Sequence, residues 1–307
     1  MNERPPIIAQ PIKVLQLNIQ RKKHTTIQLL NSLHTDFDIL LLQEPAWSFI
    51  GRDQTSGRDI DGPVALKGWQ TILPVTSTDH NSPRPRTLTY YRPRNDFNIT
   101  LRSDLLEDRD IQVLEISQAN HPNTLVINVY NDSPKGDLCV LNKLQDIIST
   151  FPDHPTIITG DFNLHHPNWS REDRALDQDQ LAISTAEWLA NKNFTLLNTR
   201  GETTHLARHA GERPSVIDLS FTNAEASRLD SFKQWAVDPN LALERPQRHQ
   251  IHTRPWPMRN PRLLPDQVQP QQSRPGGLDK DTRHGAHQLR AHTTPPPQQP
   301  SLSQCST

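Results

Sequence analysis

The chain has 307 residues, 33% of them hydrophobic, with 33 Lys and Arg against 34 Asp and Glu. This length and composition are enough for one large domain or two small ones with a real core. Residues 1–244 hold 24 basic and 31 acidic side chains (net −7), whereas residues 245–307 hold 9 and 3 (net +6). An acidic body argues against a protein that coats DNA nonspecifically, but it is compatible with a metal-dependent cleft that needs carboxylates.

The chain has two cysteines, Cys139 and Cys305, so we expect neither a disulfide framework nor a cysteine-based zinc site. Residues 1–6 lack the pattern of a secretion signal, and no window approaches the ~20 apolar residues of a membrane helix. We therefore expect a soluble intracellular protein with no membrane partner and no disulfide-linked partner. Its oligomeric state stays open.

The apolar pattern predicts many strands and few helices. Helices are expected at residues 24–33, 138–150 and 180–191, where apolar side chains recur at helical spacing. Strands are expected at residues 13–17, 38–44, 69–73, 87–91, 98–101, 111–116, 124–130, 194–197, 215–221 and 232–237, and in a β-branched run that enters Asp161. This mixture predicts two packed sheets flanked by helices.

The composition changes after about Asn240. Residues 245–307 hold 11 of the 27 prolines, many Gln and His, and few β-branched residues. Such a segment cannot bury enough apolar surface to offset its ordering entropy. We expect a short extension at residues 1–11, one domain at 12–244 and a disordered tail at 245–307.

Asp161 and Asn163 stand where a buried strand ends at Gly160, and His165 and His166 follow at once. A carboxylate and a carboxamide held side by side suit the cleavage of a phosphodiester. The Asp can orient or deprotonate a water molecule, and the Asn can hydrogen-bond the developing charge. Taken alone, the same segment could be an ordinary Asp-led turn.

Other strand ends also carry polar groups. They are Asn18, Glu44, Tyr130 with Asn131, and Asp218 within the segment that starts at Ser215. Each one alone has a structural explanation, such as a solvated strand end or a satisfied core carboxylate. Their joint order along the chain favours a common site.

That order resembles the endonuclease/exonuclease/phosphatase superfamily. Within it, the chain is most similar to the apurinic-type endonuclease domain of LINE-type (non-LTR) retrotransposons. The matching segments are Leu15–Asn18, Leu41–Pro45, Asn128–Tyr130, Gly160–Asn163 with His165–Trp169, and Ser215–Leu219. The resemblance covers roughly residues 12–240 and implies an α+β fold, a DNase I-like α/β/β/α sandwich of two mainly antiparallel sheets.

The resemblance also implies a role for each matching residue. Glu44, with Asn18 nearby, would hold Mg²⁺, or alternatively Mn²⁺. Asp161 would be the base or water-orienting group, Asn163 would stabilise the transition state, and Tyr130 would touch the phosphate or position Asp161. The catalytic set is completed by Asp218 and a histidine. The substrate contacts would come from His165, His166, Asn131 and Ser215.

One departure from the family pattern affects the histidine. The family's last strand ends in Ser-Asp-His, whose His is oriented by the Asp equivalent to Asp218, and no such triplet follows residues 232–237. His249 is the nearest substitute, with Arg248 before it in place of the Asp. The codons for Glu244–Gln247 can be written so that reading one base later yields Ser-Asp-His. We therefore predict that the tail is out-of-frame translation, from a frameshift or a misplaced intron boundary between Val237 and Glu244.

Three functions follow from these features. The first is a metal-dependent endonuclease with DNA as partner, acting in the nucleus, which nicks target DNA for retrotransposition. The second is a phosphatase of the same fold, acting on a phospholipid or an inositol phosphate. The third is a catalytically impaired retrotransposon remnant, which the missing triplet favours.

Overall fold

The computed structural model describes residues 10–33, 35–74, 84–132, 139–174, 180–206, 213–229, 231, 234–238 and 248–253. The helices are α1 (Lys23–Ser32), α2 (Cys139–Thr150), α3 (Gln180–Asn191) and α4 (Ala224–Arg228), with a 3₁₀ turn at Glu172–Arg174. The strands are β1 (Ile12–Asn18), β2 (Ile39–Gln43), β3 (Trp47–Arg52), β4 (Asp59–Pro63), β5 (Gln70–Ile72), β6 (Thr87–Tyr91), β7 (Phe97–Leu101), β8 (Ile111–Gln118), β9 (Thr124–Tyr130), β10 (Thr156–Asp161), β11 (Phe194–Leu196), β12 (Asp218–Asn223), β13 (Gln234–Asp238) and β14 (Arg248–Thr253).

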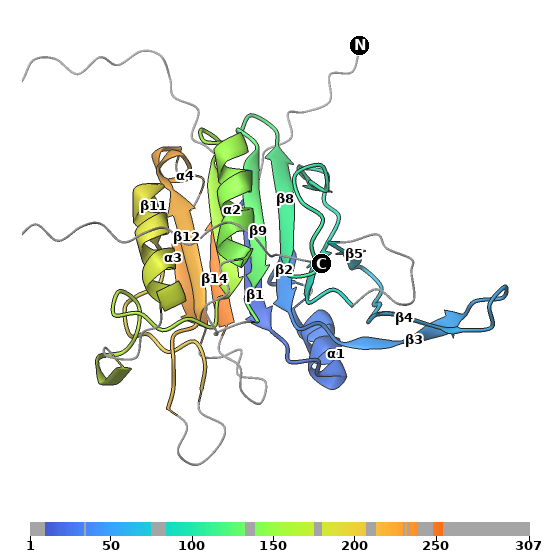
Figure 1. The fold of residues 1–307 in the computed structure, drawn as a ribbon. Coiled ribbons are helices and arrows are strands. Elements are labelled where there is room, and N and C mark those ends of the chain that lie inside the picture. The colour runs from blue at the N-terminus through green and yellow to red at the C-terminus, as the bar shows by residue number, and fades with distance from the viewer. Residues whose placement is uncertain are drawn as a thin grey trace, which may run out of the picture. The chain divides into compact units, whose positions relative to one another are not determined.

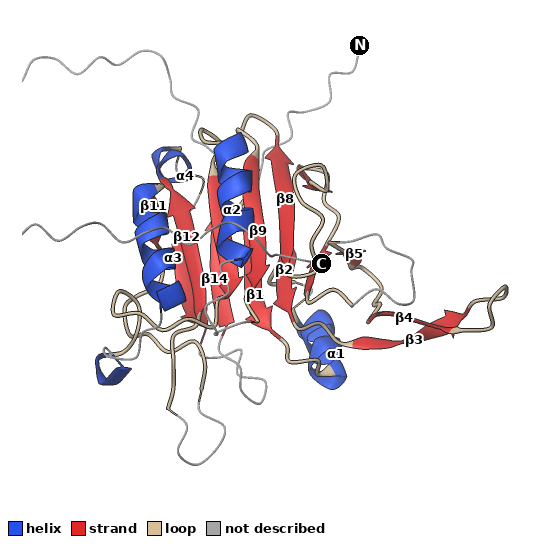
Figure 2. Cartoon of the chain, viewed as in Figure 1, coloured by secondary structure: helices blue, strands red, loops and turns tan. Residues whose placement is uncertain are grey.

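Two six-stranded sheets form the body of the domain (Figures 1 and 2). The first sheet has the order β13-β14-β1-β2-β6-β5, and the second has the order β11-β12-β10-β9-β8-β7. The pairs β1–β2 and β9–β10 are parallel and the other pairs are antiparallel. A separate hairpin, β3–β4, extends away from the sheets (Figure 1).

Helices cover the outer face of each sheet. Because side chains alternate across a strand, Leu15 and Leu17 of β1 point outward and pack with Leu29 and Leu30 of α1. On the second sheet, the outward residues of β9, such as Ile127, pack with α2 and α3. Ile12, Val14 and their neighbours fill the space between the sheets. This arrangement confirms the predicted α/β/β/α sandwich.

The layer between the sheets changes from apolar to polar along the strands. Three strands repeat an apolar residue, a buried polar residue and a site residue at every second position: Val14-Gln16-Asn18, Val126-Asn128-Tyr130 and Ile157-Thr159-Asp161. Gln43 belongs to the same layer of buried polar residues, because it accepts a hydrogen bond from Gln16 at 2.6 Å and donates one to Asn128 at 2.5 Å. The strands therefore deliver their polar ends to one edge of the sandwich.

The structure has elements that the sequence pattern did not predict. These are the hairpin β3–β4, the short helix α4 and strand β14. The predicted domain end at residue 244 lies before β14, which pairs with β1 over five positions from Ile12–Thr253 to Gln16–His249. A predicted boundary at 244 is therefore too early for the first sheet. Residues 1–9, 239–247 and 254–307 lie outside the described residues, and with them the region of the predicted Ser-Asp-His frame and most of the predicted tail.

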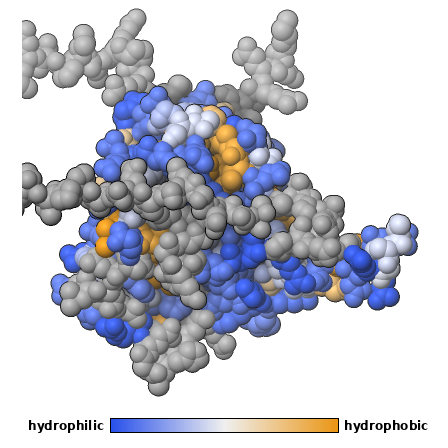
Figure 3. Space-filling model, viewed as in Figure 1, coloured by the Kyte–Doolittle hydropathy of each residue, from blue (hydrophilic) through white to orange (hydrophobic). Residues whose placement is uncertain are grey.

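The surface in view in Figure 3 is mostly hydrophilic, with small separate apolar patches. Within the described ranges, two large apolar side chains are more than half exposed, Phe49 and Ile50, and both lie on the β3–β4 hairpin. Among the helices that the structure describes, none is long and apolar enough to cross a membrane.

Candidate active site

Asn18 joins the two sheets at the polar edge of the sandwich. Its Nδ2 donates to Glu44 Oε1 at 2.9 Å and to Asp161 Oδ2 at 2.8 Å. Glu44 follows β2 in the first sheet, and Asp161 ends β10 in the second. Asn18 Oδ1 accepts the Gln20 N–H at 2.9 Å, which fixes the orientation of the Asn18 carboxamide. The structure therefore brings together three predicted site residues that are up to 143 positions apart.

Glu44 is held in one orientation by contacts to both of its carboxylate oxygens. Its backbone is in the left-handed region, with φ of +46°, and Tyr130 donates its hydroxyl to the same Oε1 at 3.0 Å. Burial, together with the negative charge of Glu44, raises the pKa of the Tyr130 hydroxyl, so this group stays a donor at neutral pH. The other oxygen, Oε2, faces the Arg21 guanidinium at 3.5 Å.

This donor set fits the divalent ion that the family implies. Mg²⁺ takes one or two carboxylates and keeps water and phosphate oxygens as its other ligands. Glu44 Oε2 offers such a ligand beside a pocket of about 280 Å³. Among the described residues, no three His, Cys, Asp or Glu side chains gather into a group that could hold a metal ion by themselves.

Asp161 is nearly inaccessible to solvent, with 4% exposure. Burial and the charge of Asp218, its cross-strand partner, raise the pKa of the Asp161 carboxyl well above its usual value. Hydrogen bonds from the Asn18 side chain and the Asn163 backbone oppose that rise. A carboxyl of this kind gains from a cation or a proton placed next to it.

A tight turn carries Asn163 past the end of β10. Gly160 has φ of +153°, and a Cβ at this position would lie 1.9 Å from the Val129 carbonyl oxygen, so only glycine fits against β9. Asn131 braces the turn: its N–H donates to the Asp161 carbonyl and its Nδ2 to the Phe162 carbonyl, both at 2.8 Å. Asn163 Nδ2 donates back to the Asn131 carbonyl at 2.7 Å. Buried Asn131 therefore positions the Asp161–Asn163 turn.

The loop after the turn is fixed by its own side chains. Trp169 is buried, and its Nε1 donates to the Leu164 carbonyl at 2.9 Å. His166 lies against the Trp169 ring, and its Nδ1 accepts the Asn168 N–H at 3.2 Å. Burial lowers the pKa of the His166 imidazole, which keeps that acceptor neutral. His165, which precedes His166, is also partly buried in this loop.

Asp218 lies next to Asp161 on β12 and is 6% exposed. Gln16 Nε2 donates to its Oδ1 at 3.1 Å. In the first sheet the backbone of His249 is paired with Gln16, so the predicted histidine stands in register with the residue that contacts Asp218. The side chain of His249 is outside the described part of the chain. Ser215, three residues before Asp218, is buried and forms a β-bridge with His205.

Three residues beside the candidate site were not predicted from the sequence. Gln16 and Gln43 form the buried amide layer behind the site, and their signal was available: each is a polar residue among apolar ones in a predicted strand. Arg86 packs over the Tyr130 ring, 5.2 Å from its centroid. It precedes a strand in a Pro-Arg segment, and its sequence neighbourhood carries no sign of a site.

Comparison with known proteins supports the same fold. Residues 124–241 match the sequence model of a family described as endonuclease-reverse transcriptase. No curated protein sequence matches the chain significantly.

Three solved structures resemble the chain in fold. The endonuclease domain of TRAS1, a telomere-specific non-LTR retrotransposon, has a TM-score of 0.60 at 20% identity, covering 80% of this chain and 99% of that one. The AP endonuclease LMAP from Leishmania major has 0.54 at 14% identity, covering 80% and 88%. An endonuclease/exonuclease/phosphatase family protein from Leptotrichia buccalis has 0.52 at 11% identity, covering 79% and 99%.

Two antiparallel-rich sheets, helices on both outer faces and polar strand ends at one edge thus occur together with a matching family model and matching folds. The chain therefore has the DNase I-like fold of these structures, and its residues 124–241 are similar to the endonuclease-reverse transcriptase family.

Proposed function

We propose that the chain is a Mg²⁺-dependent phosphodiester hydrolase, and specifically an endonuclease that nicks target DNA for retrotransposition. The observation that carries this proposal is the link from Glu44 through Asn18 to Asp161, which holds two carboxylates from different sheets at one edge. The family model and the likeness to the TRAS1 domain support the retrotransposon assignment.

The proposed chemistry uses groups that the structure holds in fixed positions. Asp161 orients or deprotonates the attacking water, with Asn18 keeping its carboxylate in place. An amide NH₂ has two donors, so Asn163 keeps one N–H for the phosphate while the other binds the Asn131 carbonyl. Tyr130 donates its hydroxyl to Glu44 Oε1 and so keeps the Glu44 carboxylate oriented.

Glu44, with Asn18 beside it, is the proposed place for the metal ion. A Mg²⁺ ion held there would supply positive charge to the scissile phosphate and to the departing oxygen. Asp218 would orient an imidazole, and His249 is the candidate because its backbone pairs with Gln16, the residue that donates to Asp218. His165 or His166, and Ser215, remain proposed substrate contacts.

A plasmid-nicking assay with Mg²⁺ tests this proposal. We expect conversion of supercoiled to nicked circles by the parent, and a loss of on the order of 10²-fold or more in Asp161→Asn. The matched control is Asp153→Asn, an exposed Asp in the turn before the other end of β10, which should nick at the parent rate. Equal nicking by Asp161→Asn and the parent would show that the proposed base is wrong.

The missing Ser-Asp-His triplet favours a second candidate, a catalytically impaired remnant of such an enzyme. Under this alternative the parent itself would nick no faster than Asp161→Asn. A phosphatase of the same fold would instead release phosphate from an inositol phosphate without nicking plasmid, so both substrates belong in the same assay.

A further inference from the structure

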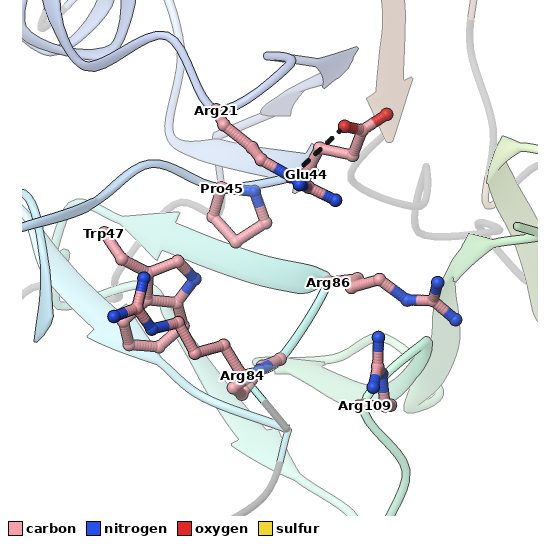
Figure 4. A pocket seen from close by; sticks show the side chains of 8 residues that line it. Arg21, Glu44, Pro45, Trp47, Arg84, Arg86 and Arg109 are labelled. Carbon is pink, nitrogen blue, oxygen red and sulfur yellow. Dashed lines mark ion pairs between the residues drawn. The ribbon is translucent and has the colours of Figure 1, made fainter. Parts of the chain in front are cut away.

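A pocket lined by four arginines opens beside Glu44 (Figure 4). Its volume is about 280 Å³. The arginines are Arg21, Arg84, Arg86 and Arg109, and Trp47 with two prolines completes the wall. This cluster stands out because residues 1–244 are acidic overall.

Backbone hydrogen bonds fix the rim of this arginine pocket. Arg21 N–H donates to the Glu44 carbonyl at 2.8 Å, and Glu44 N–H donates to the Arg86 carbonyl at 2.8 Å. Arg86 N–H in turn donates to the Arg109 carbonyl at 2.7 Å. These four residues come from four separate segments, and the last bond joins the first sheet to the second. The guanidinium groups therefore project from a rigid frame.

The four arginine heads differ in how firmly they are held. Arg86 forms ion pairs with Asp110 and Asp132, so its charge is used inside the protein. The side chains of Arg21 and Arg84 are 72% and 61% exposed. Arg109 faces Asp110 at 3.6 Å, and its buried Nε–H has no hydrogen-bond acceptor among the described residues.

We propose that this pocket binds a second phosphate of the substrate DNA strand, next to the scissile phosphate, with Trp47 against the adjoining nucleoside. The inference rests on the proposed nuclease function, since it places the second phosphate relative to Glu44. Guanidinium groups match phosphate oxygens with paired N–H donors. Arg84 and Arg109 offer such donors, and Trp47 and Pro45 offer an apolar wall.

The charge balance of the pocket supports an anionic ligand that arrives with a cation. Arg21 and Arg84 pair with single carboxylates, Glu44 and Asp61. A cation on Glu44 replaces Arg21 as the partner of that carboxylate, which leaves the Arg21 guanidinium for a phosphate. Arg84 sits at the base of the β3–β4 hairpin, where its pair with Asp61 is exposed and readily exchanged.

The test compares two substrates that differ in the number of phosphates. Bis(4-nitrophenyl) phosphate carries one phosphodiester and no neighbouring phosphate. A duplex oligonucleotide carries the scissile phosphate and the neighbouring phosphates of the same strand. In Arg84→Ala and Arg109→Ala we expect kcat/KM for the duplex to fall about tenfold more than kcat/KM for the ester, because each removes a charged hydrogen bond. Arg228→Ala is the matched control: it is 66% exposed, paired with Glu225 and on α4, and should change neither value.

DNA binding gives the second readout and separates this inference from the proposed function. In the Asp161→Asn background, fluorescence anisotropy should show the slope of log Kd against log salt reduced by about 1 in each pocket variant. Arg109→Lys should retain that slope but lose part of the affinity, since lysine keeps the charge without the paired donors. If the parent cleaves neither substrate, the hydrolase proposal fails, while the salt slope still decides the pocket. Equal losses on both substrates with an unchanged slope would overturn the proposal.

Discussion

Glu44 shows how one residue can be fixed by its backbone and its side chain together. Its backbone has a positive φ, and the side chains of Asn18 and Tyr130 both donate to Oε1. The other carboxylate oxygen, Oε2, accepts no hydrogen bond from Asn18 or Tyr130 and faces the Arg21 guanidinium at 3.5 Å.

We predict that Glu44→Gln loses nicking activity at low Mg²⁺ and regains part of it as the Mg²⁺ concentration rises. The amide keeps an oxygen but loses the charge that attracts the cation, so apparent metal affinity should fall by about tenfold or more. Metal titration of the nicking rate measures this. Asp161→Asn should show no such recovery, and recovery in both variants would contradict the separate roles.

His166 makes the loop beside the site sensitive to acid. Its Nδ1 accepts the Asn168 N–H, and burial lowers the pKa of its imidazole. The unfolded chain binds a proton near pH 6.5, whereas the folded chain resists it to a lower pH. Stability from this group is therefore complete above about pH 6.5 and is lost as the pH falls below that value.

We predict that His166→Asn reduces the difference in urea midpoint between pH 8 and pH 5. Asparagine still offers an oxygen to the Asn168 N–H and does not titrate. Urea unfolding of both proteins at the two pH values provides the comparison. The same difference in the variant as in the parent would show that His166 does not carry this pH dependence.

At the scale of elements, strands with continuous apolar or alternating patterns could be predicted from the sequence. The predicted strands at 87–91 and 124–130 coincide with β6 and β9, and the helix at 180–191 coincides with α3. Their residues encode the structure locally, through a period of 2 or of about 3.6.

The elements that were missed depend on partners and not on local pattern. β3 and β4 form a hairpin whose side chains are mostly exposed or half-buried, so no periodic apolar face marks it. β14, Arg248–Thr253, is mostly polar and lies within the proline-rich segment 245–307. Its pairing with both β1 and β13 defines it as a strand, and the pairing with β1 joins residues more than 230 positions apart.

We predict that a chain ending at residue 257 unfolds at the same temperature as the full chain, whereas a chain ending at residue 244 does not. Removing β14 leaves β1 with an open edge and β13 without a neighbour. A loss of ~2 kcal/mol would lower the midpoint of a domain of this size by roughly 4–8 °C. Thermal unfolding followed by circular dichroism measures both, and equal midpoints would show that β14 adds no stability.

At the scale of the whole molecule, the sandwich could be predicted because five segments occur in the order of the family that the sequence resembles. Which groups touch could not be predicted. Asn18 bridges two sheets, and Arg86 hydrogen-bonds Arg109 across them. Such contacts depend on how one sheet sits on the other, and the pattern of a single strand holds no information about that.

The order of the strands has a consequence for how the protein is made. The second sheet uses one uninterrupted stretch, residues 97–223, whereas the first combines residues 12–91 with residues 234–253. A ribosome adds about 5–20 residues each second, so the second sheet can assemble while β1 still waits tens of seconds for β14. During that interval β1 exposes an unpaired strand edge, and newly made chains in a crowded polysome are the nearest strands available to pair with it. Slow synthesis of the middle of this protein would therefore lengthen its period of risk, while fast synthesis would shorten it.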